Sequence, residues 1–288
     1  MRFVHFVEGT SKGLGVEQAG TLRGLTEKDH GYPGSLLDLL NAGADALKAA
    51  HDRLSDAPLI DLSKVRYLPP IERPGKIVCV GLNYAEHTKE SPYEQPSYPS
   101  FFPRFSSTLV GHGEPIIRPR VSEELDFEGE LVVIIGTGGR HISKERALEH
   151  VAGYAIFNEA SVRDYQFKSP QWTIGKNFDA TGAFGPTFVT ADELPPGASG
   201  LKLVTRLNGA IVQQGNTADM IFNVVDLISI LSEAVTLEPG DLIVTGTPAG
   251  IGWARTPKLF MKPGDLCTVE IEGLGTLSNL IADENPPA

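Results

Sequence analysis

The chain has 288 residues, of which 41% are hydrophobic and 21% are charged, and its formal net charge is −11 at pH 7. This composition is typical of a globular protein with one large domain or two unequal ones. Because the balance is acidic and no lysine–arginine cluster is present, it argues against nucleic acid or an anionic membrane surface as a partner.

The sequence also carries signals of its compartment. No apolar stretch approaches the roughly 18 residues needed to span a bilayer. The alternating start MRFVHFVEGT lacks the charged head and apolar middle of a signal peptide. Cys79 and Cys267 lie far apart in strand-like runs, so we expect buried free thiols rather than a disulfide. These features predict a cytoplasmic enzyme or binding protein that has no membrane partner.

Short strands dominate the predicted elements. Helical periodicity is confined to residues 35–54, which open with Ser35 as an N-cap, and to 143–150 and 223–233. Runs separated by glycine and proline predict strands at 2–8, 76–81, 115–117, 127–135, 153–158, 188–190, 202–207, 241–245 and 267–271. We therefore expect an α+β, mainly β architecture that closes as a sandwich or a barrel-like roll.

The prolines of segment 68–75 indicate a boundary, because proline cannot continue a helix and favours extended backbone. Residues 1–70 are then predicted to form a small N-terminal α/β module. The main domain covers residues 75–283, and residues 284–288 form a flexible tail.

Two acids separated by one residue precede an apolar run in SEELDFEGELVVIIG. If the segment is a strand, Asp126, Glu128 and Glu130 project to the same side, because side chains alternate between the two faces. Three acids on one face repel one another unless water or a cation screens them. A hard divalent cation is one remedy. A solvated strand edge is the alternative, and this segment alone leaves both open.

A histidine and a carboxylate follow the apolar run KIVCVG in GLNYAEHTKE. In a short helix, His87 and Glu90 share a face at i, i+3. A carboxylate on one imidazole nitrogen fixes the tautomer and makes the other nitrogen a better general base for a water. The same spacing also arises by chance on surface helices. The polar segment 91–100, with three prolines, fits a mobile flap.

Polar residues are dense after the predicted strand 153–158. Arg163 and Asp164 are best explained there by a structural hydrogen-bond network. Further on, Lys176 stands among apolar and aromatic neighbours, either as a snorkelling surface residue or as a cation facing the acidic site. The turn TGTPAG at 245–250 offers hydroxyls and amides that suit a substrate carboxylate, but a plain turn explains it equally well.

Taken together, these segments resemble the fumarylacetoacetate hydrolase family, in its acylpyruvase and 2-keto-4-pentenoate hydratase-like branch. The resemblance covers residues 75–283 and consists of ordered motifs: KIVCVGLNYAEHTKE, FEGELVVIIG, GYAIFNEASVRDYQ, QWTIGKNFD, GAFGP, NGAIVQQGNTADMIF, LEPGDLIVTGTPAGIG and GDLCTVEIEGLGTLSN. It implies a mixed β-roll, a homodimer, and Mg²⁺ or Mn²⁺ held on acidic residues.

The resemblance also implies roles for individual residues. The metal ligands fall on Glu128, Glu130 and Glu159, the catalytic residues on His87, Glu90 and Lys176, and the substrate contacts on Arg104, Gln166 and Thr247. Two positions depart from the family pattern. Glu159 stands where aspartate is common, and Arg104 stands where lysine is frequent, although either cation can hold an anionic substrate.

The implied activity is the metal-dependent hydrolysis of a carbon–carbon bond in a small 2,4-dioxo acid. A water activated by His87 and Glu90 attacks, and a metal-stabilised enolate leaves. Decarboxylation of oxaloacetate, or hydration or isomerisation of an unsaturated 2-keto acid, would use the same site. A non-catalytic keto-acid binder is the distant alternative. In each case the expected partner is a small keto acid.

Overall fold

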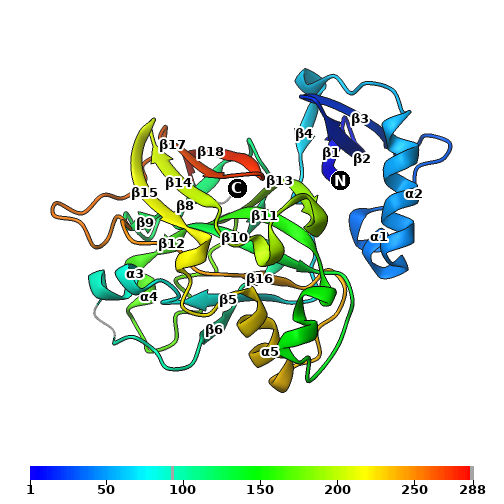
Figure 1. The fold of residues 1–288 in the computed structure, drawn as a ribbon. Coiled ribbons are helices and arrows are strands. Elements are labelled where there is room, and N and C mark those ends of the chain that lie inside the picture. The colour runs from blue at the N-terminus through cyan, green and yellow to red at the C-terminus, as the bar shows by residue number, and fades with distance from the viewer. Residues whose placement is uncertain (92–93, 286–288) are drawn as a thin grey trace.

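The computed structural model describes residues 1–91 and 94–285, which form a mainly β fold around one long sheet (Figure 1). That sheet runs in the order β3 (Thr21–Thr26), β2 (Ser11–Gln18), β1 (Arg2–Glu8), β13 (Gly182–Thr190), β11 (Val151–Glu159), β10 (Gly129–Ile135), β16 (Leu242–Val244), β5 (Ile77–Gly81) and β6 (Ser100–Pro103). Outside this path, β4 (Val65–Tyr67) pairs with β1, and β7 (Leu109–Val110) pairs with β13.

A second sheet and a short strand pair complete the β structure. The second sheet has the order β15 (Ala210–Asn216), β14 (Lys202–Leu207), β17 (Leu266–Ile271), β18 (Gly275–Asp283) and β8 (Ile116–Arg118), and β12 (Ser161–Val162) pairs with β9 (Leu125–Asp126). The predicted α+β, mainly β class is confirmed. In the described part of the chain the sheets stay open and form no closed barrel. Of the architectures expected from the sequence, this excludes a roll that closes into a barrel.

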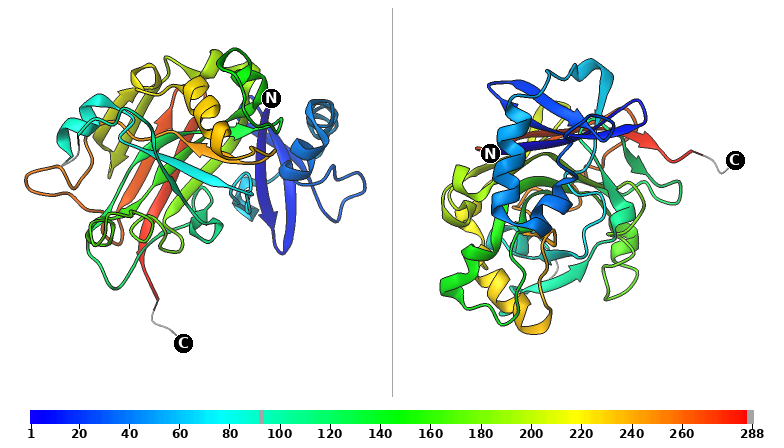
Figure 2. Two further views of the ribbon diagram at one scale, coloured as in Figure 1. Left: turned by 90° about the horizontal axis from the view of Figure 1, so that it is seen from below. Right: turned by 90° about the vertical axis from the view of Figure 1, so that its right-hand side faces the viewer.

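The predicted helix over 35–54 is two helices, α1 (Leu36–Ala42) and α2 (Ala44–Ser55). Ser35 caps α1 as expected, in a capping box with Asp38. The break falls at Gly43, whose φ of 95° lies in the left-handed region that favours glycine and ends the first helix. Helix α2 packs against β2 and β3 at one end of the molecule (Figure 2).

Of the helices predicted over 143–150 and 223–233, only the second is an α-helix. Helix α5 (Val224–Ala234) is capped by the Asn223 side chain and confirms the helix expected over 223–233. The segment expected over 143–150 is a 3₁₀ helix, Lys144–His150, that packs against α5. Two short helices, α3 (Ala85–Glu90) and α4 (Arg163–Gln166), follow strands near the site described below.

The sequence patterns missed the hairpin of β2 and β3. Glycines at positions 13 and 15 weaken the strand signal, yet the packing explains them. A Cβ on Gly13 would lie 2.4 Å from the Phe6 ring, and one on Gly15 would lie 2.7 Å from the Arg23 carbonyl oxygen. The absence of side chains there lets the neighbouring strands pack closely.

Strand β10 lies between two hydrophobic cores. All seven of its residues are buried. Leu131, Val133 and Ile135 join the core of the second sheet and α5. On the opposite face, Val132 and Ile134 join the core formed with α1 and α2. Because both faces are covered, a charged side chain on this strand can only be accommodated near its end.

The N-terminal residues are continuous with the main sheet, because β1 pairs with β13 and Phe3 shares a core with Phe184 and Phe188. The domain division at residue 70 stays a prediction. In the tail, Glu284 accepts a hydrogen bond from the Arg120 backbone N–H, whereas residues 286–288 lie outside the described residues.

Two expectations about the chain as a whole can be compared with the structure. Cys79 and Cys267 are both buried and unpaired, as predicted. In the residues described, none of the helices combines the length and apolar character needed to cross a membrane.

His5 generates a prediction about stability and pH. Its Nδ1 lies 2.9 Å from the Pro69 carbonyl oxygen, which ties β1 to the proline-rich segment. Burial lowers the pKa of His5 below its ordinary value of 6.5, despite the opposing effects of this hydrogen bond and of Glu72. The neutral form therefore contributes stability that is present above about pH 6.5 and is lost as the pH falls through the folded-state pKa.

In the variant His5→Asn, the amide can donate to Pro69 in place of Nδ1–H but takes up no proton. We expect its free energy of unfolding to fall less than that of the wild type between pH 7.5 and pH 5.5. Urea denaturation at both pH values measures the difference. Equal losses in the two proteins would contradict the assignment.

Candidate active site

Glu128, Glu130 and Glu159 come together through the antiparallel pairing of β10 with β11. Gly129 pairs with Asn158, so Glu128 lies opposite Glu159, whose backbone N–H donates to the Glu128 carbonyl oxygen at 2.8 Å. Glu130 lies on β10, two residues after Glu128, so the two side chains face the same side of the sheet. Each of the three side chains offers a carboxylate oxygen within 4.8 Å of the other two. Two acids thus come from one strand, and the third comes from its neighbour.

This carboxylate cluster has the chemistry of a divalent-cation site. Glu128 is 4% exposed, and Glu130 and Glu159 are each 1% exposed. Burial and the negative charges of Glu159 and Glu128 raise the pKa of Glu130 well above its usual range, because the acids repel one another. Buried oxygen donors of this kind suit hard cations such as Mg²⁺ and Mn²⁺. The residues present therefore fit a divalent metal ion.

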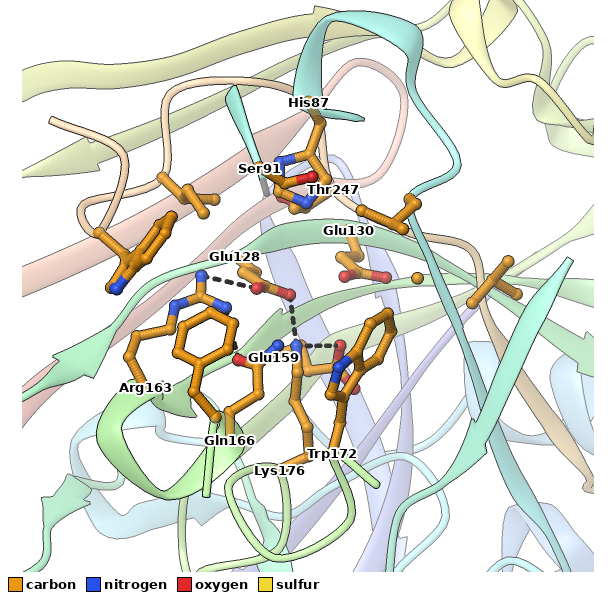
Figure 3. A pocket seen from close by; sticks show the side chains of 16 residues that line it. His87, Ser91, Glu128, Glu130, Glu159, Arg163, Gln166, Trp172, Lys176 and Thr247 are labelled. Carbon is orange, nitrogen blue, oxygen red and sulfur yellow. Dashed lines mark hydrogen bonds and ion pairs between the residues drawn. The ribbon is translucent and has the colours of Figure 1, made fainter. Parts of the chain in front are cut away.

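Two buried cations, Lys176 and Arg163, contact the same acids (Figure 3). Lys176 Nζ donates to Glu128 Oε2 at 2.8 Å and to Glu159 Oε2 at 3.0 Å. Arg163 Nη2 lies 2.7 Å from Glu128 Oε1. Burial opposes ionisation of Glu128, but the charges of Lys176 and Arg163 outweigh it and lower the pKa of Glu128 far below its usual range. Lys176 thus faces the acids rather than solvent.

Asp126 lies outside the carboxylate cluster. Its Oδ1 accepts from the backbone N–H groups of Phe127 and Gly252, and its Oδ2 accepts from the N–H of Trp253 and from Arg163 Nε. Residues 126–130 do not form one continuous strand, so the condition under which the three acids would share a face is not met. The chain leaves the ladder at residues 127–128, where its strand partner changes from β12 to β11. Asp126 instead holds Arg163 and the 252–253 turn in place.

Arg104 lies behind the cluster and has no exposed side-chain surface. Its Nη1 is 3.6 Å from Glu159 Oε1. Its remaining donors reach the hydroxyls of Thr108 and Thr181 and the carbonyl oxygen of Ala160. The sequence predicts a substrate contact for Arg104, whereas the anionic group that it meets in the structure is the Glu159 carboxylate.

Helix α3 carries both His87 and Glu90. His87 lies above the acids (Figure 3). His87 Nδ1 lies 3.0 Å from Glu90 Oε1, which requires Nδ1 to carry the proton and leaves Nε2 as the free nitrogen. Glu90 in turn accepts hydrogen bonds from the backbone N–H groups of Gly250, at 2.9 Å, and Ile251, at 3.3 Å. The expected pairing is present, while its catalytic role stays a prediction.

Two amides of the 245–250 turn donate to protein carboxylates. The Gly246 N–H donates to Glu130 Oε2 at 2.5 Å, and the Gly250 N–H donates to Glu90. The hydroxyl of Thr247 donates to the Gly129 carbonyl oxygen at 2.9 Å and accepts from Gln213 at 2.9 Å. These groups position the acids, so the Gly246 and Gly250 amides are already used, while the predicted substrate contact of Thr247 stays a prediction.

The cluster and His87 line one pocket. Trp172 and Trp253, the chain's two tryptophans, also line it. Trp172 packs on Gly81, where a Cβ would lie 2.2 Å from the indole ring. Trp253 stacks on Phe167 with ring centroids 5.0 Å apart. The pocket therefore combines a charged interior with aromatic walls, an arrangement suited to a small anion with a short apolar portion.

Several residues that line the pocket were not predicted from the sequence to belong to the site. Arg163 was expected in a structural network, and it does hold Gln166 Oε1 at 2.8 Å, but it also contacts Glu128. Asp164 accepts instead from the Ser122 hydroxyl. Counting the acids could have indicated Arg163, because three buried carboxylates require buried cations. For the tryptophans of the pocket wall, no spacing in the sequence provided a signal.

The fold and the acidic pocket define a class of metal-dependent enzymes. The chain belongs to the fumarylacetoacetate hydrolase family: the family model "Fumarylacetoacetate (FAA) hydrolase C-terminal" matches residues 76–282. The chain is also similar to a mitochondrial oxaloacetate tautomerase of Rattus norvegicus. They are 40% identical over 287 residues, which cover 98% of this chain and 91% of the relative.

Solved structures agree with this assignment. A fumarylacetoacetate hydrolase from the psychrophile Exiguobacterium antarcticum superposes with a TM-score of 0.87 and 38% identity, covering 99% of this chain and 100% of that one. A maleylpyruvate hydrolase from Sphingobium sp. SYK-6, in complex with manganese(II) and pyruvate, superposes with a TM-score of 0.81 and 26% identity. It covers the same shares of the two chains. The family resemblance of the motifs is confirmed, and the relatives are keto-acid enzymes.

Asp126 generates a prediction about stability. Removing its carboxylate in Asp126→Ala leaves Arg163 and the 252–253 turn with unpaired buried donors. We expect a loss of about 3–5 kcal/mol in the free energy of unfolding, measured by urea denaturation. The control is Asp283→Ala, which removes a mostly exposed partner of Arg118 and should cost about 1 kcal/mol or less. Similar losses in the two variants would contradict the role of Asp126.

Proposed function

We propose that the protein is a divalent-metal-dependent tautomerase that interconverts the keto and enol forms of oxaloacetate. The observation that carries the proposal is one small pocket that combines a cation-binding carboxylate cluster, a buried ammonium group and a histidine paired with a carboxylate. The full-length similarity to an oxaloacetate tautomerase supports the choice of substrate.

Glu128, Glu130 and Glu159 would hold the cation, which we propose to be Mg²⁺ or Mn²⁺. A cation bound there supplies a Lewis acid that stabilises negative charge on the substrate's C2 oxygen. The manganese and pyruvate in the related maleylpyruvate hydrolase support this choice.

Keto–enol exchange moves one proton from C3 of oxaloacetate to the oxygen on C2. We assign both transfers to His87 Nε2, the nitrogen left free by the contact between Nδ1 and Glu90. Nε2 takes the proton from C3, the C–H electron pair forms the C2=C3 double bond, and the carbonyl π electrons move onto the oxygen. The imidazolium then gives the proton to that oxygen. Glu90 stabilises the imidazolium between the two transfers.

Lys176 stabilises the negative charge that develops on the C2 oxygen. Burial opposes its own charge, but Glu128 and Glu159 raise the pKa of Lys176, so the side chain stays an ammonium ion. The aromatic walls formed by Trp172 and Trp253 limit the access of water to the reacting groups. Exclusion of water favours proton transfer over addition of water, whereas Lys176 would serve either reaction.

Hydrolysis of a 2,4-dioxo acid, the activity first expected from the sequence, is the second candidate. The His87–Glu90 pair favours it, because the same free nitrogen can activate a water for attack on C4. Similarity to the maleylpyruvate hydrolase supports it as well. The two reactions share the acids and Lys176, and they differ in whether His87 takes a proton from carbon or from water.

We also propose that the enzyme is a homodimer, as the family resemblance implies, and that it acts in the cytoplasm, as the sequence predicts. Light scattering after size exclusion measures the assembly state.

Removal of the metal tests the proposed reaction. Treatment with EDTA should abolish the acceleration of enol-to-ketone conversion, and Mg²⁺ or Mn²⁺ should restore it. The measurement is the loss of ultraviolet enol absorbance after enol oxaloacetate is dissolved, with metal and buffer without enzyme as the control. Pyruvate release from acetylpyruvate, followed with lactate dehydrogenase, detects hydrolysis. Release of pyruvate without acceleration of enol conversion would decide for the hydrolase.

His87→Asn tests the proposed base. The asparagine amide can still donate to Glu90 but provides no group in place of Nε2. We expect kcat for tautomerisation to fall about 10²–10⁴-fold, while the affinity for Mn²⁺, measured by quenching of tryptophan fluorescence, stays close to that of the wild type. The matched control is Glu86→Gln, an exposed residue of the same helix. A kcat in His87→Asn equal to that of this control would refute the assignment.

A further inference from the structure

Arg104 is held in a fixed orientation at the back of the carboxylate cluster. Its Nε donates to the Thr108 hydroxyl at 3.0 Å, and its Nη2 donates to the Thr181 hydroxyl at 2.6 Å. Gly182 leaves space for the guanidinium, because a Cβ there would lie 2.9 Å from Arg104 Nε. These contacts hold two of the three guanidinium nitrogens, and the third, Nη1, faces Glu159.

Nη1 of Arg104 and Oε1 of Glu159 are a buried pair of opposite charge, 3.6 Å apart. That distance is too long for a hydrogen bond. Each atom is buried and has no hydrogen-bond partner of its own in the described part of the chain. In this dry environment the attraction between the two charges is strong. The guanidinium therefore draws one oxygen of Glu159 away from the pocket.

The two oxygens of Glu159 thus have different surroundings. Oε2 lies on the pocket side, 3.0 Å from Lys176 Nζ, whereas Oε1 faces Arg104. With Oε1 held at the back, Glu159 offers a cation one oxygen rather than two. This matters for the choice of metal, because Ca²⁺ accepts six to eight oxygens and readily takes both oxygens of a carboxylate, whereas Mg²⁺ requires a compact octahedral set.

We propose that Arg104 is a positioning residue that restricts Glu159 to a single ligand oxygen and so makes the site selective for small octahedral cations over Ca²⁺. The inference rests on the proposed cation site and deepens it. It also gives Arg104 a role different from the substrate contact that the sequence predicts. A long glutamate is needed for this arrangement, because its carboxylate must reach both the buried arginine and the pocket.

Competition between metals tests the proposal directly. Free Mn²⁺ is followed by its electron paramagnetic resonance signal as the metal-free protein is titrated, and Ca²⁺ is then added to displace the bound Mn²⁺. The ratio of the two dissociation constants is compared in the wild type, in Arg104→Met and in the control Arg118→Met. Arg118 is ion-paired with Asp283 and does not line the pocket.

We expect Arg104→Met to bind Mn²⁺ about 10–100-fold more weakly, the range found when a partner of a metal ligand is removed. Ca²⁺ affinity should change much less or increase, so that the preference for Mn²⁺ falls by a similar factor. Arg118→Met should keep the wild-type ratio. In parallel, the spectrum of bound Mn²⁺ should differ between Arg104→Met and the wild type, because one of its ligands has changed its mode of binding.

Thr181→Val provides the second variant, in case Arg104→Met does not fold. It removes the hydroxyl that accepts from Nη2 and keeps the buried charge, so it should shift the ratio in the same direction by a smaller factor. An unchanged ratio in a folded variant overturns the proposal, and a raised KM for oxaloacetate with an unchanged ratio assigns Arg104 to the substrate instead. If the wild type binds neither metal, the proposed function fails together with this inference.

Discussion

The burial of several carboxylates side by side determines which other charged groups must lie at the site and where the strands around it can place them. Four acids and three cations lie at the pocket with almost no exposed surface: Asp126, Glu128, Glu130, Glu159, Arg104, Arg163 and Lys176. Carboxylates at these separations stay ionised only where positive charge lies close by. The formal charges of the seven groups leave one negative charge in excess. A divalent cation reverses that sign, which suits a pocket that must attract an anionic keto acid.

The fold meets this constraint by placing the acids at the end of a strand that is covered on both faces. Strand β10 passes between two hydrophobic cores, and its acids lie where it leaves the ladder. The 245–250 turn then supplies backbone amides to Glu130 and Glu90. One loop thereby fixes both the cation site and the orientation of His87. Backbone donors and buried ion pairs thus fix the positions of these side chains.

The metal-site acids and the histidine pair were accessible from local spacing. Glu128 and Glu130 follow from the two-residue period of a strand, and His87 with Glu90 from the helical period. Glu159 required the family resemblance, because its partner strand lies about thirty residues away. The partners of Asp126 and Arg104 could not be predicted from the sequence for the same reason. Both satisfy the strand or motif pattern, but their actual partners come from distant segments that no local period reports.

The sequence by itself determined the fold class, half of the eighteen strands in the described residues, the buried free thiols and the family, because these depend on patterns within short segments or on ordered motifs. Only the tertiary structure decided which charges meet. It showed that Lys176 and Arg163 neutralise Glu128, that Arg104 faces Glu159, and that both tryptophans line one pocket. The physical reason is that electrostatic pairing and aromatic packing depend on distances in space, and segments far apart in the chain set those distances.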